Sequence, residues 1–599
     1  MISSVQDYPV SHYFNPDGYQ RFFIPKYQRE YVWRRENWDA LFNDVEDLPE
    51  GHFLGSIICV NNQRDAMAGS RLELVDGQQR FTTISLFFCA LYERLSRIGD
   101  PSDDLQVELV NLRNRIFVRG TDDWRFEPSE QNYNKIDFQK VLSGIFPRKV
   151  VAPRNLAYFG NRRISKAYIY FRDRLLQCDD LEAETLLNKL KTAILVKIEV
   201  PSHSDAFVLF ETINNRGIPL SAIDIIKNNI LAELDKIAGY GIDRAFDEWK
   251  DLVDRLPDPG VQERFLRQLY NSFRYLKRVD VPGIPRATKS NLIKVYDTLI
   301  QRNPRLLFRE LRTRGEVYSA LINPVLAAET WGTKAAEALT DLQRLGAAPS
   351  YGFLLWAQHV AKTKAWNEAV VIEALATGLT KWFFWRNLTD TPATRDLDSL
   401  FVDLIRGTMK KLRSSELQDS GAFVNAALDG LKERAASAER CKTQLAGDIY
   451  VENYDATRFM LCKLEQAHQT RETKRDLWEY LPNGKPLFTV EHILPKGEAL
   501  TAEWAEMITA NSTDDADTIR ARCAHRIGNL TLSGYNSALG KMSFQKKRDR
   551  VNEHREVIGY RNGLYLNQSI AALEHWDEDA INLRSEALTD EVITVLGIW

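Results

Sequence analysis

The stretch 488–536 constrains the fold of this 599-residue chain more than any other part of its sequence. Its first apolar residues stand two positions apart, a spacing typical of one face of a strand. Pro495 has no backbone N–H to donate, so a hydrogen-bonded strand cannot continue through it. The sequence therefore predicts that Glu491 and His492 lie where strand pairing stops.

Polar side chains of this stretch suit the hydrolysis of a phosphodiester. That reaction needs a base to take a proton from water and a cation to neutralise the negative charge that develops. His492 suits the first role, and Glu491 with Asn536 suits the second. Taken alone, His492 is better interpreted as a hydrogen-bonded histidine at a surface strand end. The chemical interpretation is favoured because Asn529 and Pro495 accompany it in this order.

The order Glu-His-x-x-Pro, Gly-Asn-Leu-Thr-Leu and a further Asn resembles HNH nucleases of the ββα-metal type. The resemblance implies that His492 is the general base and that Asn529 steadies the catalytic loop. It also implies that Glu491 and Asn536 hold one divalent ion, Mg²⁺ or Mn²⁺. Many relatives have Asp at the position of Glu491, and the longer carboxylate can still reach an ion.

Length and composition limit the class of protein. A chain of 599 residues exceeds what one core usually organises, so two to four domains are expected. The net charge of -3 argues against a protein that coats nucleic acid over its whole surface. No apolar run of membrane-spanning length and no signal-like start occurs, so we expect a cytoplasmic protein with no membrane partner. Six scattered cysteines without a Cys-x-x-Cys pair argue against a zinc site built on paired cysteines.

A second informative region lies near the start of the chain. Residues 21–33 mix aromatic rings with cations, which suits stacking on bases and contact with phosphates, or equally a strand packed at a domain edge. Trp38, Leu41, Phe42 and Val45 follow helical spacing and are predicted core residues.

Two strands and a turn are predicted next. Residues 53–60 and 71–75 read as paired strands, and a helix that is apolar almost all round covers 81–91. The turn between them is Asp76-Gly77-Gln78-Gln79-Arg80. It is either a phosphate-binding helix start or a plain strand-turn-helix corner, and composition does not decide between them.

Ile-Pro-x-Tyr-Gln-Arg-x-Tyr-x-Trp followed by Asp-Gly-Gln-Gln-Arg resembles the N-terminal domain of GmrSD-type restriction systems, a ParB-like or sulfiredoxin-like fold. The resemblance continues over 210–220, after a predicted strand at 194–200. It implies hydrolysis of GTP or ATP and sensing of modified DNA. The implied nucleotide-binding residues are Asp76, Gly77, Gln78, Gln79, Arg80, Asn215 and Arg216. The candidates for contact with the DNA modification are Tyr27, Arg29 and Tyr31.

The sequence leaves the role of Arg216 open and excludes one class of nucleotide site. Arg216 could reach a phosphate from its turn, or could equally be a solvated turn arginine. No Gly-x-x-x-x-Gly-Lys-Ser/Thr loop occurs, so any nucleotide site is not of the Walker type.

The middle and the end of the chain complete the predicted organisation. Residues 236–440 read as amphipathic helices that form a spacer, and the dense aromatic run 382–385 is predicted to lie in a core. After Asn536, a basic run on a predicted helix is interpreted as phosphate-contacting rather than as a solvated face. Its members are Lys541, Lys546, Lys547 and Arg548.

Together these features predict an α+β multidomain protein with a ParB-like α/β domain, a helical middle and a ββα-metal HNH domain. The predicted boundaries are 1–235, 236–440 and 441–599. The resemblance implies a type IV restriction endonuclease that cuts modified double-stranded DNA in phage defence, and a homodimer is compatible with it. Modified cytosine and phosphorothioate, the latter read by an SspE-like subgroup, remain open as targets. The alternatives are a nucleoside triphosphatase sensor and a DNA-binding regulator that cuts little or not at all.

Overall fold

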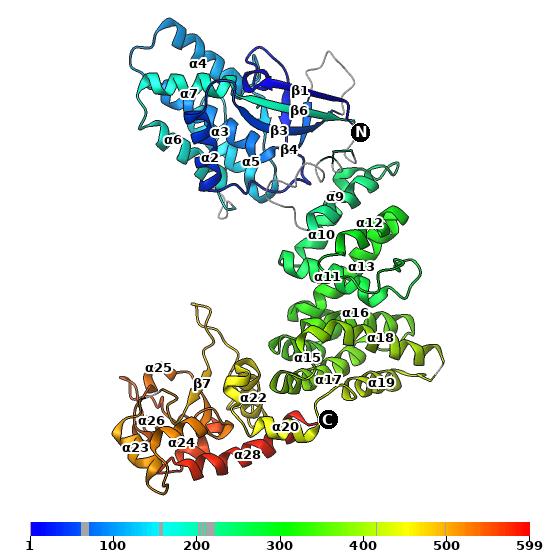
Figure 1. Cartoon of the computed structure of the whole chain (residues 1–599), viewed down its shortest axis with the longest axis vertical. Helices are drawn as coiled ribbons and strands as arrows, with labels where there is room; N and C mark the ends of the chain where they lie inside the picture. Colours follow the sequence, from blue (N-terminus) through cyan, green and yellow to red (C-terminus); the bar gives the residue numbers. More distant parts are fainter. Residues whose placement is uncertain are drawn as a thin grey trace. The chain divides into compact units, whose positions relative to one another are not determined.

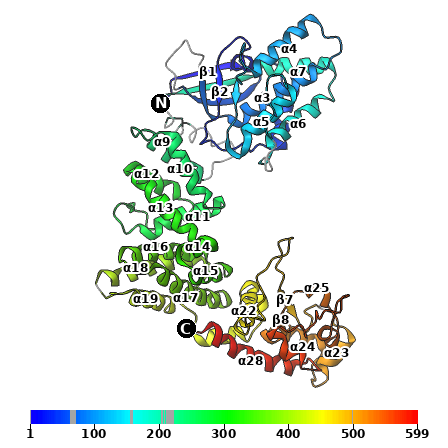
Figure 2. The same ribbon diagram turned by 180° about the vertical axis from the view of Figure 1, so that it is seen from behind.

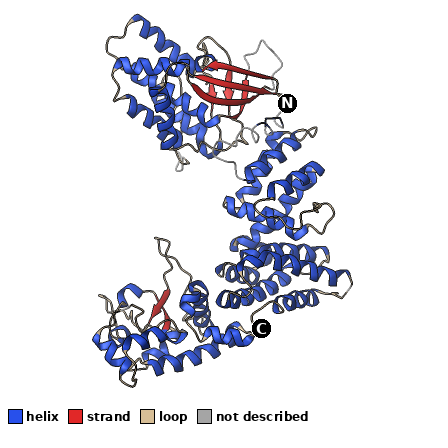
Figure 3. Ribbon diagram, viewed as in Figure 1, coloured by secondary structure: helices blue, strands red, loops and turns tan. Residues whose placement is uncertain are grey.

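The computed structural model describes residues 2–61, 71–154, 160–201, 205–206, 209, 222–414, 416–497 and 499–599. The chain divides into two compact units. Unit 1 comprises Met1–Glu263 and Thr288–Arg312, and unit 2 comprises Arg264–Ala287 and Thr313–Trp599. The helical segment predicted as a spacer is thus shared between the two units. The predicted mixed α+β class is confirmed (Figure 3).

Unit 1 contains one mixed sheet with the strand order β1-β6-β3-β4-β2-β5. β3 pairs parallel with β6 and antiparallel with β4, and β4 pairs parallel with β2. The predicted strands at 53–60, 71–75 and 194–200 are confirmed. The strands are β1 (Ser4–Pro9), β2 (Arg21–Phe23), β3 (Phe53–Val60), β4 (Arg71–Asp76), β5 (Phe126–Glu127) and β6 (Ile194–Val200).

Unit 1 also contains helices, and Figures 1 and 2 show α3 and α6 beside the sheet. α3 is buried on nearly all sides, which explains why its sequence lacks a polar face. The four predicted core residues of α2 are all buried. The helices are α1 (Val10–Tyr13), α2 (Arg35–Asp47), α3 (Gln78–Leu95), α4 (Asp103–Ile116), α5 (Asn134–Ile145), α6 (Arg163–Leu175), α7 (Asp180–Thr192), α9 (Ala222–Asp235), α10 (Ile242–Asp254) and α12 (Leu292–Arg302).

The helical part of unit 2 is organised around α17, which carries the aromatic run. Trp382 and Trp385 are buried, and their indole N–H groups donate to the carbonyls of Leu431 (3.0 Å) and Gly597 (2.7 Å). The predicted core position of this run is confirmed. The helices are α11 (Pro259–Phe273), α13 (Pro304–Ile322), α14 (Pro324–Trp331), α15 (Thr333–Arg344), α16 (Tyr351–Thr363), α17 (Glu368–Thr389), α18 (Leu397–Arg413), α19 (Ser420–Lys432) and α20 (Ala438–Leu445). α11 begins in unit 1, and α13 passes from unit 1 into unit 2.

The last part of unit 2 surrounds a short antiparallel pair, β7 (Thr489–His492) and β8 (Leu530–Ser533). The predicted strand end is confirmed, because pairing stops at His492. The predicted short helix is α23, where Trp504 and Ile508 are buried. The helices here are α21 (Ile449–Glu452), α22 (Tyr454–Ala467), α23 (Ala502–Thr509), α24 (Ala516–Cys523), α25 (Asn536–Leu539), α26 (Phe544–Arg548), α27 (Tyr565–Ala571) and α28 (Glu578–Leu596). Within the described ranges, no helix combines enough length and apolar character to cross a membrane.

Candidate active site

Two neighbouring residues at the end of β7 face different surroundings. Glu491 pairs with Thr531 and His492 pairs with Leu530 across the two-stranded ladder. Because successive side chains of a strand point to opposite faces, the carboxylate and the imidazole are directed apart. The two groups therefore meet different partners.

Glu491 forms a buried ion pair with Lys547. The Lys547 ammonium lies 2.7 Å from Glu491 Oε1 and also donates to the carbonyls of His492 (2.8 Å) and Ile493 (3.1 Å). Glu491 is 4% exposed and Lys547 is 0% exposed. Burial raises the pKa of Glu491 and lowers the pKa of Lys547, and the attraction between the two opposes both shifts. An ammonium group thus already balances the carboxylate that was predicted to bind a metal ion.

Both contacts of the Glu491 carboxylate lie on one oxygen, Oε1, and its role as a metal ligand stays a prediction. Tyr560 adds its hydroxyl at 3.4 Å from the same oxygen that Lys547 contacts. A divalent ion could replace Lys547 at Oε1 only if that ammonium group were left buried without its partner.

His492 faces a second histidine. Its Nε2 lies 3.2 Å from Nδ1 of His525, and the edge of one ring meets the face of the other. Burial, followed by the charges of His525, Lys496 and Lys547, lowers the pKa of His492 to about 3. The imidazole is therefore neutral at neutral pH and has a lone pair that can accept a proton.

Three residues that the sequence motifs did not include complete the surroundings of His492. Tyr450 places its ring 4.4 Å from the imidazole and stacks on His525 at 5.5 Å between centroids. Lys496 lies 3.1 Å from the Tyr450 hydroxyl. Two of them have a sequence signal, because His525 directly precedes Arg526 of the Gly-Asn motif and Lys496 directly follows Pro495. Tyr450 has none, since it comes from α21, far away in the sequence.

Asn529 joins the two chain segments next to the pair β7–β8. It is fully buried, and its amide N–H groups donate to the carbonyls of Leu494 and Ala524, both at 2.9 Å. Its Oδ1 accepts from the Leu494 N–H (2.8 Å) and from Trp576 Nε1 (3.1 Å). All four hydrogen-bonding positions of the amide are used within the protein. The geometry agrees with the predicted loop support and leaves no group of Asn529 for a substrate.

Asn536 is held against β7 by one end of its amide only. Nδ2 donates to the Val490 carbonyl (2.8 Å) and to Thr489 Oγ1 (3.2 Å). Oδ1 has no hydrogen-bond donor within the described part of the chain. Of the two predicted metal ligands, Asn536 thus keeps an open amide oxygen, whereas Glu491 has one carboxylate oxygen paired with Lys547.

In unit 1, the predicted nucleotide site is a tight corner between β4 and α3. Gly77 has φ +81°, and a Cβ atom there would lie 2.6 Å from Ile57 Cγ2, so the position requires glycine. The predicted Asp-Gly turn is confirmed in this respect. It starts α3 at Gln78 and sets the direction of the side chains that follow.

The two glutamines of the corner hold the neighbouring loop. Gln79 accepts from the Val32 N–H at 2.8 Å and donates to the Glu30 carbonyl at 3.0 Å. Gln78 donates to Gln28 Oε1 at 3.3 Å. Both glutamines are buried. The Gln79 amide is occupied within the protein at both ends, which corrects the prediction that it binds a nucleotide. Gln78 uses one amide N–H in this way, and its role at a nucleotide site stays a prediction.

Asp76 and Arg80 remain partly exposed beside a third charged residue. The Arg80 guanidinium lies against the backbone of Gly55 and donates to the Ser56 carbonyl at 3.2 Å. Burial raises the pKa of Asp76, against the Gly77 N–H bond and the charges of Arg80 and Arg29. The Nε of Arg29 is buried and has no hydrogen-bond partner in the described part of the structure. The two guanidinium groups and one carboxylate form a cluster with a net positive charge, in which Arg29 Nε is an unsatisfied donor within the described ranges.

The comparisons with known proteins assign both ends of the chain. Residues 10–231 match the model described as GmrSD restriction endonuclease, N-terminal domain, and residues 437–591 match GmrSD restriction endonucleases, C-terminal domain. The chain belongs to the GmrSD restriction endonuclease family. The predicted resemblance is confirmed, and the family supports a restriction endonuclease that acts on DNA in defence. No match was found among curated proteins.

Two of the predicted DNA contacts of this GmrSD protein are corrected in the basic run. Lys547 is held by Glu491, and Arg548 is buried between Asp549 and Glu574, at 2.8 Å from each. Neither can reach a phosphate on the surface. Lys541 and Lys546 are exposed and stay candidates for DNA contact.

Two predicted contacts with the DNA modification are also corrected in unit 1. Tyr27 is 1% exposed and donates its hydroxyl to Glu73. Tyr31 is 3% exposed, and its hydroxyl lies 2.6 Å from Thr83 Oγ1 and accepts from the indole of Trp38. Both rings belong to the core of unit 1, so they offer no surface to DNA. The predicted nucleotide-binding residues Asn215 and Arg216 lie outside the described residues.

Proposed function

We propose that this GmrSD protein is a modification-dependent DNA endonuclease of the HNH type in which His492 is the general base. The observation that carries the proposal is the position of the His492 imidazole at the end of β7, where its Nε2 lies 3.2 Å from Nδ1 of His525. A base must be unprotonated before it can take a proton from water. The low pKa of His492, about 3, keeps it so throughout the physiological range.

A divalent ion, Mg²⁺ or Mn²⁺, is part of this proposal. Such an ion would supply positive charge where the phosphate becomes more negative. Asn536 offers an open amide oxygen, whereas Glu491 is paired with Lys547. Omission of the ion and addition of EDTA test this part separately from the role of His492.

The proposed N-terminal function is the binding and hydrolysis of GTP or ATP. The support is the cluster of Asp76, Arg80 and Arg29, where a buried guanidinium N–H lacks a partner within the described residues. A phosphate group bound beside these residues would balance the excess positive charge. Nucleotide binding could then bias the protein between two states, one that cuts and one that does not.

Cleavage of matched DNA substrates tests the endonuclease proposal. Unmodified, base-modified and phosphorothioated duplexes are incubated with the wild type and with His492→Ala, with Mg²⁺ or Mn²⁺, with and without GTP or ATP. Cutting of one modified duplex that is lost in His492→Ala supports the proposal. Cutting that survives the substitution would remove His492 as the base.

A nucleoside triphosphatase sensor with little cutting is the second candidate, and the unsatisfied Arg29 donor favours it. Phosphate release by Asp76→Ala and Arg80→Ala separates a nucleotide site from a purely structural corner. If both variants hydrolyse at the wild-type rate, the N-terminal site is wrong. If no duplex is cut while hydrolysis continues, the sensor becomes the better description.

A further inference from the structure

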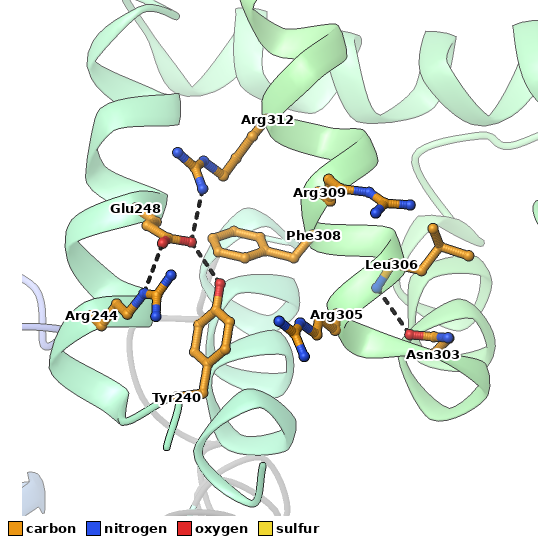
Figure 4. A pocket seen from close by; sticks show the side chains of 9 residues that line it. All are labelled: Tyr240, Arg244, Glu248, Asn303, Arg305, Leu306, Phe308, Arg309 and Arg312. Atoms are coloured by element: carbon orange, nitrogen blue, oxygen red, sulfur yellow. Dashed lines mark hydrogen bonds and ion pairs between the residues drawn. The ribbon is translucent and has the colours of Figure 1, made fainter. Parts of the chain in front are cut away.

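An arginine-rich pocket of about 470 Å³ lies in unit 1 between α10 and α13 (Figure 4). Its lining residues fall within 240–312, and neither family match covers this part of the chain. The family therefore assigns no role to the pocket. Four arginines and a single carboxylate line it. They are Arg244, Arg305, Arg309, Arg312 and Glu248.

Glu248 organises one side of this pocket. Arg244 Nε lies 3.1 Å from one carboxylate oxygen, and Arg312 Nη1 lies 2.9 Å from the other. The Tyr240 hydroxyl donates to Glu248 at 2.6 Å. Partial burial opposes the effect, but the bonds from Tyr240 and Arg244 and the charge of Arg312 hold the pKa of Glu248 below its usual value. One carboxylate thus orients two guanidinium groups and balances one of four positive charges.

The other two arginines have no partner among the residues that the structure describes. Arg305 and Arg309 are exposed and form no hydrogen bond or ion pair within the described part of the chain, and Figure 4 shows both side chains at the pocket. Together with Arg312 they stand at i, i+4 and i+7 of α13, which places all three on one helix face. That face extends about 10 Å along the helix. Like charges at this spacing repel one another, so a bound anion would lower the electrostatic repulsion between them.

The helices that carry the arginines are fixed against each other. Phe308 of α13 is buried, and its ring stacks on that of Trp249 from α10 at 6.3 Å between centroids. The guanidinium groups therefore project from a packed helix pair and not from a loop. Guanidinium is planar, always charged and able to contact a phosphate with two parallel bonds.

We propose that this arginine pocket binds the phosphate backbone of the DNA that the protein restricts. An elongated row of cations matches an extended polyanion, because successive phosphates can each neutralise one guanidinium and release counterions. The pocket would hold DNA independently of its sequence, as an anchoring site in unit 1. The residues proposed to cut DNA all lie in unit 2.

DNA binding by the full chain tests this inference. The His492→Ala background prevents cutting, and fluorescence anisotropy with a labelled duplex is measured over a series of salt concentrations. In Arg305→Ala/Arg309→Ala, we expect the Kd at low salt to rise about tenfold or more and the salt slope to fall by about two. Arg305→Lys/Arg309→Lys keeps both charges and should keep most of the slope.

A matched control removes the same charge elsewhere in unit 1. Arg97 and Arg119 are 53% and 63% exposed at their side chains and pair with Glu93 and Asp17. Arg97→Ala/Arg119→Ala should change the Kd less than about twofold. Equal weakening in both double variants, or none in either, would overturn the proposal. Circular dichroism checks that both fold alike.

A second arm separates the two sources of phosphate. Binding of GTP and ATP is measured by calorimetry for the wild type and Arg305→Ala/Arg309→Ala. Unchanged nucleotide binding with weakened DNA binding supports a DNA-backbone site. Lost nucleotide binding with unchanged DNA affinity would overturn the proposal and assign the pocket to a free triphosphate.

Discussion

The corner at Asp76–Arg80 and the strand end at Glu491–His492 both contain residues that hold the structure beside residues with a free chemical group, but they arrange them differently. In the corner, the two middle residues are bonded to the loop before α2, and the charged residues at its ends stay partly exposed. At the strand end, adjacent residues divide the tasks, because one faces Lys547 and the next faces His525. A short motif therefore contains both residues that hold the structure and residues with a free chemical group. Burial and hydrogen-bond partners separate the two kinds.

The largest expected effect comes from removing the free group at the strand end. His492→Ala should lower the cleavage rate about 10²- to 10⁴-fold, because a positioned base contributes on that order. The measurement is single-turnover cleavage of the preferred duplex. His554→Ala, which removes an exposed histidine of the same unit, should cut at the wild-type rate. A stable His492→Ala protein that cuts at the wild-type rate would show that His492 is not the reactive residue of the strand end.

The neighbouring lysines of α26 test the structural role of the buried ion pair at the strand end. Lys547→Ala should cost about 3–5 kcal/mol of unfolding free energy, since it leaves the Glu491 carboxylate buried without its partner. Lys546→Ala should stay within about 0.5 kcal/mol, because that side chain is exposed. Urea denaturation measures both.

A double variant sharpens this result. Lys547→Met combined with Glu491→Leu removes both charges and should recover much of the lost stability. Equal stability of the two single lysine variants would show that the buried pair does not form.

The corner offers a smaller test of the same kind. Gln79→Ala leaves the Val32 N–H and the Glu30 carbonyl without their partner and should cost about 1–3 kcal/mol. Gln106→Ala, at an exposed position of α4, provides the matched control in thermal unfolding. If Gln79→Ala instead abolished nucleotide hydrolysis at unchanged stability, the amide would belong to the ligand site.

The smallest expected effect concerns the orientation of the base. His525 Nδ1 lies 3.2 Å from His492 Nε2 and holds the orientation of its ring. His525→Ala should lower kcat about tenfold, the value of one lost hydrogen bond, with unchanged KM and thermal midpoint. His525→Asn, which can restore a hydrogen bond, should recover part of the rate. A lowered midpoint in place of a lowered kcat would make His525 a packing residue only.

Local patterns predicted those parts of the structure that depend on neighbouring residues in the chain. The strand end at His492, the core face of α2 and the buried run in α17 all follow from spacing within one element. The basic run could not be resolved in this way. Lys546 and Lys547 look alike in sequence, but only Lys547 meets a carboxylate 56 residues earlier in the chain.

The same limit applies to aromatic and polar residues of the candidate sites. Tyr27 and Tyr31 are predicted to contact the DNA modification, but they are buried against Glu73 and Thr83, partners more than 40 residues away in the sequence. Tyr450 reaches His492 from a separate helix, and no spacing rule connects the two. Contacts between distant segments decide which members of a motif are free to react.

The division of the chain has a consequence for how the protein is made. The backbone changes unit three times, after Glu263, after Ala287 and after Arg312. On the ribosome, unit 1 stays incomplete until Arg312 has emerged, although most of it is already exposed. Residues 264–287 emerge earlier than the rest of unit 2 and cannot complete their packing until it has emerged. A protease that cuts once at any point between Arg264 and Arg312 releases neither unit whole.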